Sequence, residues 1–238
     1  AGQPYAAGGI RNTIEATRNA TDEQLEANTR RLLDESLRSG STTVECKTGY
    51  GQTVAHELRS TTIAASLTDE VTLLAAHVPP PEYAGRADDY VAMVCAEMID
   101  ACAPQAKWID VFCETGAFDR DQAHAFSPPE WRRAHPPRPR QPAPRGPGSP
   151  ARRRTGGAAS VDHVCYTTQA DIDALAQSST VATLLPGADF STRNKYPDAR
   201  ALLDAGGSRW LSVRIATPAP ATPPACRSAS RSRCGTCT

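Results

Sequence analysis

Residues 42–77 read TTVECKTGYGQTVAHELRSTTIAASLTDEVTLLAAH, and this stretch decides the fold class. The β-branched residues at 42–47 predict a strand, which a glycine-rich turn at 48–51 ends. Residues 56–67 predict a helix, and the apolar run at 71–76 predicts a second, buried strand. A strand, a helix and a strand in this order form a βαβ unit, so we expect the two strands to be parallel.

The same alternation continues on both sides of this unit. Thr21 and Gln24 have the spacing of a reciprocal helix cap, which predicts a helix that begins there and ends at Gly40. Downstream, the pattern predicts helices over residues 87–103, 119–125, 169–176 and 198–204, and strands over residues 108–113, 158–163 and 180–185. Short strands that alternate with helices over this length favour an α/β fold, part of a (β/α)8 barrel, over a small open sheet.

Candidate site residues follow the predicted strands, because the chemistry of a barrel lies where its strands end. These residues are Lys47 with Tyr50, His77, Glu114 and His163. An imidazole at the place of His77 can hydrogen-bond a substrate or titrate near neutral pH. The competing interpretations are an ordinary loop histidine for His77 and a turn residue for Tyr50.

The chain carries 26 Lys and Arg against 26 Asp and Glu, but the two signs are unevenly distributed. Residues 126–157, the first basic segment, hold eight Arg and nine Pro against one acidic residue. Residues 207–238, the second basic segment, hold five Arg, four Pro and no acidic residue. The rest of the chain therefore has a net charge of −12. We expect residues 1–206 to form an incomplete barrel domain that the first segment interrupts, and both basic segments to be disordered.

Several function classes are disfavoured by what the sequence lacks. No stretch approaches the roughly 18 to 20 consecutive apolar residues of a membrane span, and residues 1–10 do not resemble a signal peptide. The cysteines are scattered, as in a reducing compartment, and Cys234 and Cys237 form a C-x-x-C without a second pair. We expect a cytoplasmic protein without membrane or nucleic-acid partners. A non-catalytic binder of anionic surfaces or nucleic acid through the basic segments is the alternative.

Six short stretches together resemble the imidazolonepropionase family of the amidohydrolase superfamily. They are YAAGGI at 5–10, TTVECKTGYG at 42–51, AHVPP at 76–80, IDVFCE at 109–114, SVDH at 160–163 and LLPGA at 184–188. The resemblance covers residues 1–125 and 158–206. It implies a metal-bearing (β/α)8 barrel with a small β-sandwich, usually dimeric. Such an enzyme uses zinc or iron to hydrolyse the cyclic amide of 4-imidazolone-5-propanoate to N-formimino-L-glutamate in histidine degradation.

The resemblance also implies roles for single residues. Tyr50 and His77 match residues of the family that contact the substrate, and His163 matches the histidine that assists proton transfer or polarises the reacting carbonyl. The family's metal-ligating H-x-H precedes the position of Ala1, and its other metal ligands, a His and an Asp, fall within the two basic segments. The resemblance thus implies an N-terminally truncated fragment without metal ligands, which binds no catalytic metal and has no hydrolase activity.

We interpret the two basic segments as frameshifted translations. Arg, Pro and Ala have GC-rich codons, and neither segment contains a lysine. In shifted frames, synonymous codons permit the family's metal-His segment within residues 126–157 and its metal-Asp segment within residues 207–238. A continuous reading frame in the coding DNA, without insertions or deletions relative to intact homologues, would contradict this interpretation. Another cyclic-amide hydrolase of the same superfamily is the second enzyme hypothesis.

Overall fold

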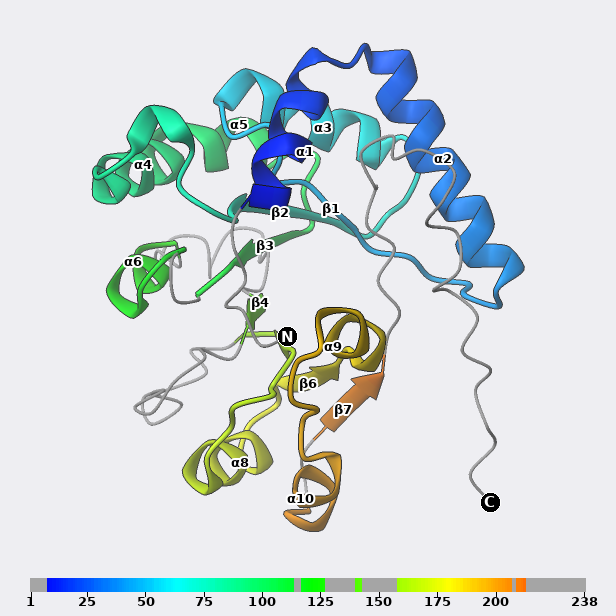
Figure 1. Cartoon of the computed structure of the whole chain (residues 1–238), viewed down its shortest axis with the longest axis vertical. Helices are drawn as coiled ribbons and strands as arrows, with labels where there is room; N and C mark the ends of the chain where they lie inside the picture. The colour runs from blue at the N-terminus through cyan, green and yellow to red at the C-terminus, as the bar shows by residue number, and fades with distance from the viewer. Residues whose placement is uncertain (1–7, 114–116, 127–139, 143–157, 207–208, 213–238) are drawn as a thin grey trace.

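The computed structural model describes residues 8–113, 117–126, 140–142, 158–206 and 209–212 (Figure 1). The strands of this part of the chain form one seven-stranded sheet in chain order, and each neighbouring pair is parallel. They are β1 (Cys46–Lys47), β2 (Val71–Ala76), β3 (Trp108–Val111), β4 (Arg140–Pro142), β5 (Ser160–Asp162), β6 (Val181–Leu184) and β7 (Arg209–Ser212). The predicted α/β class is confirmed. Within the described residues no pairing joins β1 to β7, so the sheet is unclosed.

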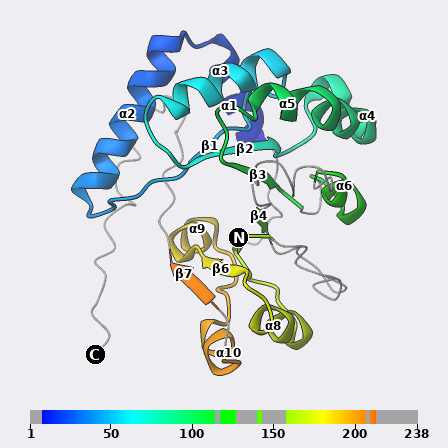
Figure 2. The same ribbon diagram turned by 180° about the vertical axis from the view of Figure 1, so that it is seen from behind.

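The sheet curves so that two groups of elements face each other, β1 to β3 with α1 to α5 and β5 to β7 with α8 to α10 (Figures 1 and 2). The helices are α1 (Gly8–Asn19), α2 (Asp22–Arg38), α3 (Val54–Ala65), α4 (Ala87–Met93), α5 (Ile99–Cys102), α6 (Arg120–Ala125), α8 (Gln169–Ala176), α9 (Pro186–Thr192) and α10 (Ala199–Asp204). A 3-10 turn, η1 (Pro81–Tyr83), precedes α4, and a π-helical stretch, η2 (Val94–Met98), joins α4 to α5. None of the helices in the described ranges is long and apolar enough to cross a bilayer.

The predicted cap of the first long helix is confirmed. The Thr21 hydroxyl accepts a hydrogen bond from the backbone N–H of Gln24 at 3.3 Å, and the Thr21 backbone N–H donates to the Gln24 side chain at 2.9 Å. These two bonds satisfy backbone donors that an uncapped helix end leaves without intrahelical partners. Helix α2 therefore begins directly after Thr21 and extends to Arg38, close to the predicted end at Gly40.

The strand predicted over residues 42–47 is shorter than expected. Only Cys46 and Lys47 pair with β2, because β2 begins at Val71 and Val71 lies opposite Cys46. Residues 42–45 therefore extend beyond the end of β2. Their β-branched residues have no part of β2 opposite them with which to form a strand pairing. The other predicted strands and helices of the described residues are present, with ends that differ by a few residues.

The prediction that both basic segments are disordered is wrong for two short stretches. Arg140–Pro142 forms β4, which pairs with β3 and β5, and Arg209–Ser212 forms β7, which pairs with β6. A proline removes only its own backbone donor, and Pro142 is the last residue of its strand, while β7 contains no proline. The remaining parts of both segments lie outside the described residues, except Phe126.

The hydrophobic core is divided between the two groups of elements. In the first, Tyr90 and Met98 of the helix that runs through α4, η2 and α5 pack with Phe118 against β2 and β3, and all three side chains are buried. In the second, Leu175 of α8 and Leu202 of α10 pack against β6. Within the described residues no apolar cluster spans both groups.

We expect Met98→Ala to lower the free energy of unfolding by about 2–5 kcal/mol, because it removes a fully buried side chain and leaves a cavity. Met93→Ala makes the same chemical change on the same helix at a partly buried position and should cost clearly less. Urea unfolding followed by circular dichroism measures both values. Equal losses for the two variants would contradict the packing described for Met98.

Candidate active site

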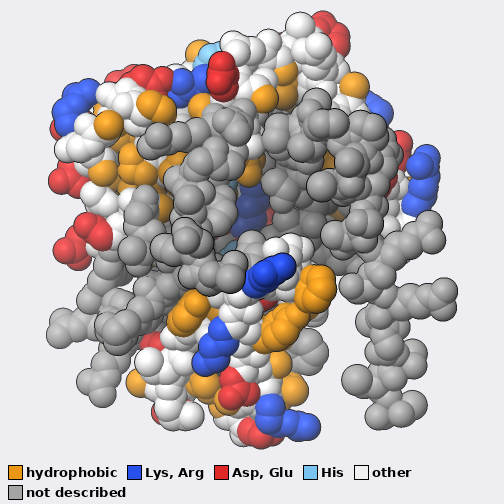
Figure 3. Space-filling view, in the orientation of Figure 1, with side chains coloured by type: hydrophobic (Ala, Val, Ile, Leu, Met, Phe, Trp, Pro, Cys, Tyr) orange, Lys and Arg blue, Asp and Glu red, His pale blue; other side chains and the backbone are white. Residues whose placement is uncertain are grey.

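The centre of the candidate site is an ion-pair cluster between three strands. The Lys47 ammonium on β1 lies 2.6 Å from Oδ2 of Asp110 on β3 and 2.9 Å from Oδ2 of Asp162 on β5. Both carboxylates are buried, and the Lys47 side chain is 28% exposed. In a barrel, alternate strands contribute side chains to one interior layer, and β1, β3 and β5 are alternate strands here. Figure 3 shows Lys or Arg and His side chains at the bottom of a hollow between the two groups of elements.

The charges of this cluster are strongly coupled. Burial opposes the charge of Lys47, but Asp110 and Asp162 outweigh burial and raise the pKa of the ammonium, which stays protonated. Burial raises the pKa of the Asp110 carboxyl, and the neighbouring charge of Asp162 acts in the same direction, whereas Lys47 lowers it. Two carboxylates therefore share one ammonium.

His77 follows β2 directly and lies in an aromatic setting. Its ring is 5.1 Å from the ring of Tyr50 and 5.7 Å from the ring of Phe112, both in edge-to-face arrangements. Burial and the nearby charge of Lys47 lower the pKa of His77 to about 4, against the opposing effect of a hydrogen bond with the Gly49 backbone. His77 is thus neutral at pH 7, and of the two roles expected for it, hydrogen bonding is compatible with this environment while titration near neutral pH is not.

The turn that carries Tyr50 is fixed by a buried carboxylate. Glu57 of α3 is fully buried and accepts hydrogen bonds from the backbone N–H groups of Gly49, Gly51 and Gln52, at 2.9, 2.7 and 2.7 Å. A carboxylate that accepts several backbone N–H groups binds them more strongly than a neutral acceptor does. Glu57 was not expected as a site residue, because its position in a predicted helix is typical of a solvent-facing side chain.

Close packing against β2 adds to this constraint. Gly49 has a φ of +108°, and a Cβ at this position would lie 2.3 Å from the carbonyl oxygen of Leu74. Only glycine combines that conformation with that approach. In addition, the side-chain amide of Gln52 donates to the carbonyl of Val78 at 2.6 Å, immediately after His77. The Tyr50 turn and the end of β2 therefore form one rigid unit.

His163 lies at the end of β5, where the backbone leaves the extended conformation. His163 and Val164 have φ values of +71° and +46°, and a left-handed conformation is unusual for a β-branched residue such as Val164. Nδ1 of His163 is 4.0 Å from Oδ1 of Asp189, which is buried in the first turn of α9. The Cys165 thiol lies 3.2 Å from the same carboxylate oxygen. Asp189 was not expected as a site residue, because nothing in its local pattern relates it to His163.

The structure brings some of the predicted residues together. Tyr50 and His77 are in ring contact, and Lys47 joins Asp162, the residue directly before His163. Glu114 lies outside the described residues, so its predicted place in the site is untested. Asp110 and Asp162 were not predicted as partners of Lys47, although an aspartate within an apolar strand is the kind of signal that could have identified them.

The described part of the chain does not provide a metal site. It contains no group of three or more His, Cys, Asp or Glu side chains arranged to hold a metal ion. The carboxylates of Asp110 and Asp162 both bind the ammonium of Lys47. The C-x-x-C of Cys234 and Cys237 lies outside the described residues.

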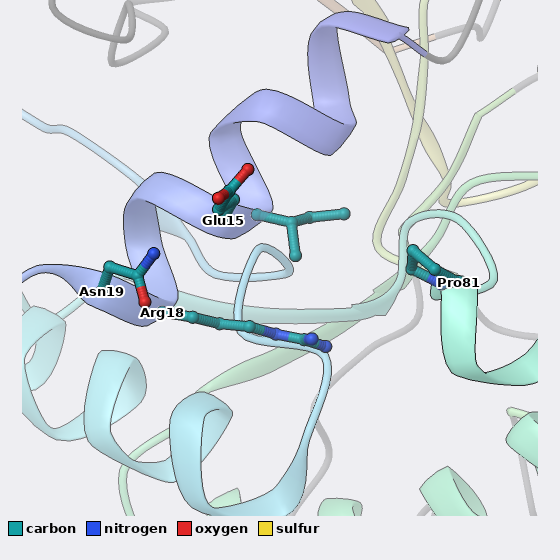
Figure 4. Close-up of a pocket in the computed structure, with 5 residues that line it drawn as sticks. Glu15, Arg18, Asn19 and Pro81 are labelled. Atoms are coloured by element: carbon teal, nitrogen blue, oxygen red, sulfur yellow. The ribbon is translucent and has the colours of Figure 1, made fainter.

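A surface pocket lies beside α1 and the start of η1 (Figure 4). It is lined by Ile14, Glu15, Arg18, Asn19 and Pro81, and contains none of the predicted site residues. Arg18 anchors this region to the rigid turn, because its Nε donates to the Gly51 carbonyl at 2.8 Å while its guanidinium pairs with Glu82 of η1.

Comparison with known proteins reveals close relatives. The chain is 84% identical over 206 residues to the imidazolonepropionase of Rhodococcus jostii, 70% identical over 205 residues to that of Nocardia farcinica and 58% identical over 211 residues to that of Mycolicibacterium smegmatis. These alignments cover 87%, 86% and 89% of the chain but 51%, 52% and 53% of the relatives. The chain thus spans about half the length of the curated relatives it matches. It matches none of the protein-family models with which it was compared.

We expect Glu57→Gln to lower the free energy of unfolding by about 1–3 kcal/mol, because an amide group would face backbone donors that need an acceptor. The backbone amides of Gly49, Gly51 and Gln52 should then exchange faster with deuterium. Glu35→Gln is the matched control, since Glu35 forms an exposed ion pair with Arg31 and should cost less than about 0.5 kcal/mol. Unchanged amide exchange in Glu57→Gln would contradict the proposed constraint on the turn.

The neutral state of His77 predicts a pH effect on stability. The pKa of His77 is about 4 in the fold against 6.5 for a free imidazole, so the unfolded chain binds the proton first as pH falls. The neutral His77 ring therefore contributes fully to the stability of the fold above pH 6.5, and this contribution is lost as the pH falls toward 4. Urea titrations from pH 7 to 4 should therefore show a smaller loss of stability in His77→Gln than in the wild type. Parallel curves would contradict the lowered pKa.

Proposed function

We propose that the whole protein hydrolyses 4-imidazolone-5-propanoate to N-formimino-L-glutamate. The chain is a homologue of the imidazolonepropionases over about half of their length. The observation that carries this proposal is the 84% identity over 206 residues to the enzyme of Rhodococcus jostii. That identity favours imidazolonepropionase over another cyclic-amide hydrolase. The expected cytoplasmic location and homodimer are part of the same proposal.

The architecture supports a partial (β/α)8 barrel of the amidohydrolase kind. Seven parallel strands in chain order, joined by six neighbouring pairings, correspond to a (β/α)8 barrel that is one strand short and therefore unclosed within the described residues. We assign residues 1–206 to this barrel domain and residues 207–238 to a basic tail, except for β7, which extends the sheet. No contact among the described residues favours the alternative function, in which the basic segments bind anionic surfaces or nucleic acid.

We assign substrate contact to Tyr50 and His77. The Tyr50 turn is held by Glu57, and His77 is held between two aromatic rings, so both side chains are preorganised for binding. A neutral imidazole offers one donor and one acceptor, which suits the alternating N–H and C=O groups of a cyclic amide.

We assign proton transfer to His163. In the hydrolysis, a water oxygen bonds to the ring carbonyl carbon, the carbonyl carbon–nitrogen bond breaks, and the nitrogen that leaves takes a proton. The net change is the addition of one water. His163 can receive the proton of the water and return it to the nitrogen, and its neighbour Asp189 stabilises the charged imidazole in between.

The metal of the family is not assigned to residues of this chain. The described residues do not fit a metal site, and the resemblance places the ligands upstream of Ala1 and within the basic segments. When bound in the whole enzyme, the metal would activate the attacking water. We therefore assign only substrate binding and proton transfer to this chain, through Tyr50, His77 and His163.

Ligand binding to the chain tests the assigned site. We expect imidazolonepropionate to shift the NMR signals of Tyr50, His77 and His163, and His77→Gln to weaken binding by about tenfold, the equivalent of one lost hydrogen bond. His56→Gln, at a partly exposed position in the first turn of α3, is the control and should bind normally. No shift at saturating ligand concentration would contradict the site assignment.

Turnover tests the function. In preparations that hydrolyse imidazolonepropionate, His163→Gln should lower kcat by about 10²- to 10⁴-fold, which is the usual contribution of a proton-transfer group. The loss of imidazolone absorbance and the appearance of formiminoglutamate measure the rate. Retention of full activity in His163→Gln would remove His163 from the mechanism.

A further inference from the structure

Hydrogen bonds around Asp189 join the end of α9 to the segment that carries His163. Asn194, the second residue after α9, donates its backbone N–H to the Asp189 carbonyl at 2.9 Å and its side-chain amide to Oδ1 of Asp189 at 3.3 Å. The Tyr166 hydroxyl in turn donates to the side-chain oxygen of Asn194 at 2.8 Å. Asn194 therefore holds Asp189 and is itself held by the segment that follows His163.

This network fixes the carboxylate of Asp189 next to the imidazole of His163. The oxygen that Asn194 binds, Oδ1, is the one that lies 4.0 Å from Nδ1 of His163, and the Asp189 side chain is 1% exposed. The Cys165 thiol lies 3.2 Å from the same oxygen. A separation of 4.0 Å is longer than a hydrogen bond, but such contacts are often long in a site without substrate and shorten when it binds.

The backbone on both sides of this contact has an unusual conformation. Arg193, which lies between α9 and Asn194, has a φ of +54°, and His163 has a φ of +71°. The backbone N–H of His163 also donates to the Thr183 carbonyl at 3.0 Å. Left-handed residues other than glycine persist where surrounding contacts hold them, and they are frequent at functional sites. Both partners of the contact are thus held in place by their own segments.

The contact relates to the choice between the two nitrogens of the His163 ring. A neutral imidazole carries one proton, and the hydrogen bond made by one nitrogen decides which of the two holds it. A carboxylate beside Nδ1 favours the form that is protonated on Nδ1. Nε2 then has a free lone pair, which a group that receives a proton from water needs.

We propose that Asn194 is a positioning residue for His163: it holds the Asp189 carboxylate beside Nδ1 of the ring, so that Nε2 is the nitrogen that exchanges protons with the substrate. Asn194 acts through Asp189. The exchange of protons with the substrate rests on the proposed function. The relation between Asn194 and the protonated nitrogen of His163 does not, because it is a property of the folded chain.

The test identifies the nitrogen that carries the proton in the His163 ring. Whole chain with isotope-labelled histidine is studied by NMR at about pH 8, where imidazole is neutral and the nitrogen shifts distinguish the two forms. The five rings are assigned by single His→Gln variants. The test variant is Asn194→Ala, which removes the side-chain amide and keeps the backbone N–H. The matched control is Asn28→Ala, because Asn28 is also partly buried and its side chain binds Arg31 on α2.

We expect the His163 ring of the wild type to carry its proton on Nδ1. Asn194→Ala should lower the ratio of the form protonated on Nδ1 to the form protonated on Nε2 by about fivefold, the equivalent of one hydrogen bond. Asn28→Ala should leave this ratio unchanged. A wild-type ring protonated on Nε2, or an unchanged ratio in folded Asn194→Ala, would overturn the proposal.

Asn194→Ser covers the case in which Asn194→Ala does not fold. The serine keeps a polar side chain and the backbone N–H that donates to the Asp189 carbonyl. Its hydroxyl is one bond shorter than the amide group that reaches Asp189 and Tyr166 in the wild type. A lower ratio in this variant supports the proposal, and an unchanged ratio overturns it.

Turnover separates this proposal from the proposed function. In preparations that hydrolyse imidazolonepropionate, Asn194→Ala should lower kcat by about fivefold and leave KM unchanged, because the assigned role of His163 is proton transfer and not substrate binding. A raised KM with an unchanged kcat would overturn the positioning role. Absence of turnover in every preparation would defeat the proposed function without altering the relation between Asn194 and the His163 ring.

Discussion

The ion pairs of Lys47 with Asp110 and Asp162 are the constraint on which the arrangement of the site depends. The two apolar clusters belong to opposite groups of elements, and the described residues contain no apolar cluster that joins them. The Lys47 cluster spans this division, since Lys47 and Asp110 belong to one group and Asp162 to the other. Loss of one partner would leave a buried charge uncompensated, which is far more costly than the net value of an intact pair.

Around this cluster the site is built from rigid rather than adaptable parts. The carboxylate of Glu57 gathers three backbone donors of the Tyr50 turn, and the Gln52 side chain binds this turn to the segment after β2. His163 extends from a left-handed stretch of backbone that surrounding contacts must maintain. Such a site holds its polar groups in place before a ligand arrives, so little ordering is left for the moment of binding.

Local patterns in the sequence were sufficient for much of the fold. Periodicity and the Thr21 cap predicted α2, the helix over residues 87–103 and the parallel strands β2, β3 and β6, because those features depend on neighbours in the chain. Helices α1 and α9 were not predicted. Glycines at the start of α1 weaken its local helix signal, which packing overrides, whereas Pro186 in the first turn of α9 is a helix-start signal that was overlooked.

The site was predictable in its single residues but not in their partners. Strand ends identified Lys47, His77 and His163 as candidates, since the ends of parallel strands meet at one edge. The pairing of Lys47 with Asp110 depends on strand register across 63 residues, and the approach of Asp189 to His163 depends on how α9 packs. Both relations arise through space, so no local pattern contains them. In the basic segments, strands β4 and β7 likewise owe their form to neighbouring strands.

The π-helical stretch Val94–Met98 has a consequence for changes in chain length. A π turn accommodates one residue more than an α-helical turn over the same path, and it rotates the residues that follow back toward the face of those that precede it. Here it brings Ile99 and Cys102 onto the buried face that begins with Tyr90. Deleting one exposed residue of this stretch, Ala96 or Glu97, would therefore leave a continuous α-helix with Ile99 and Cys102 still on the buried face, whereas the present residues wound as an uninterrupted α-helix would turn Ile99 out of the core.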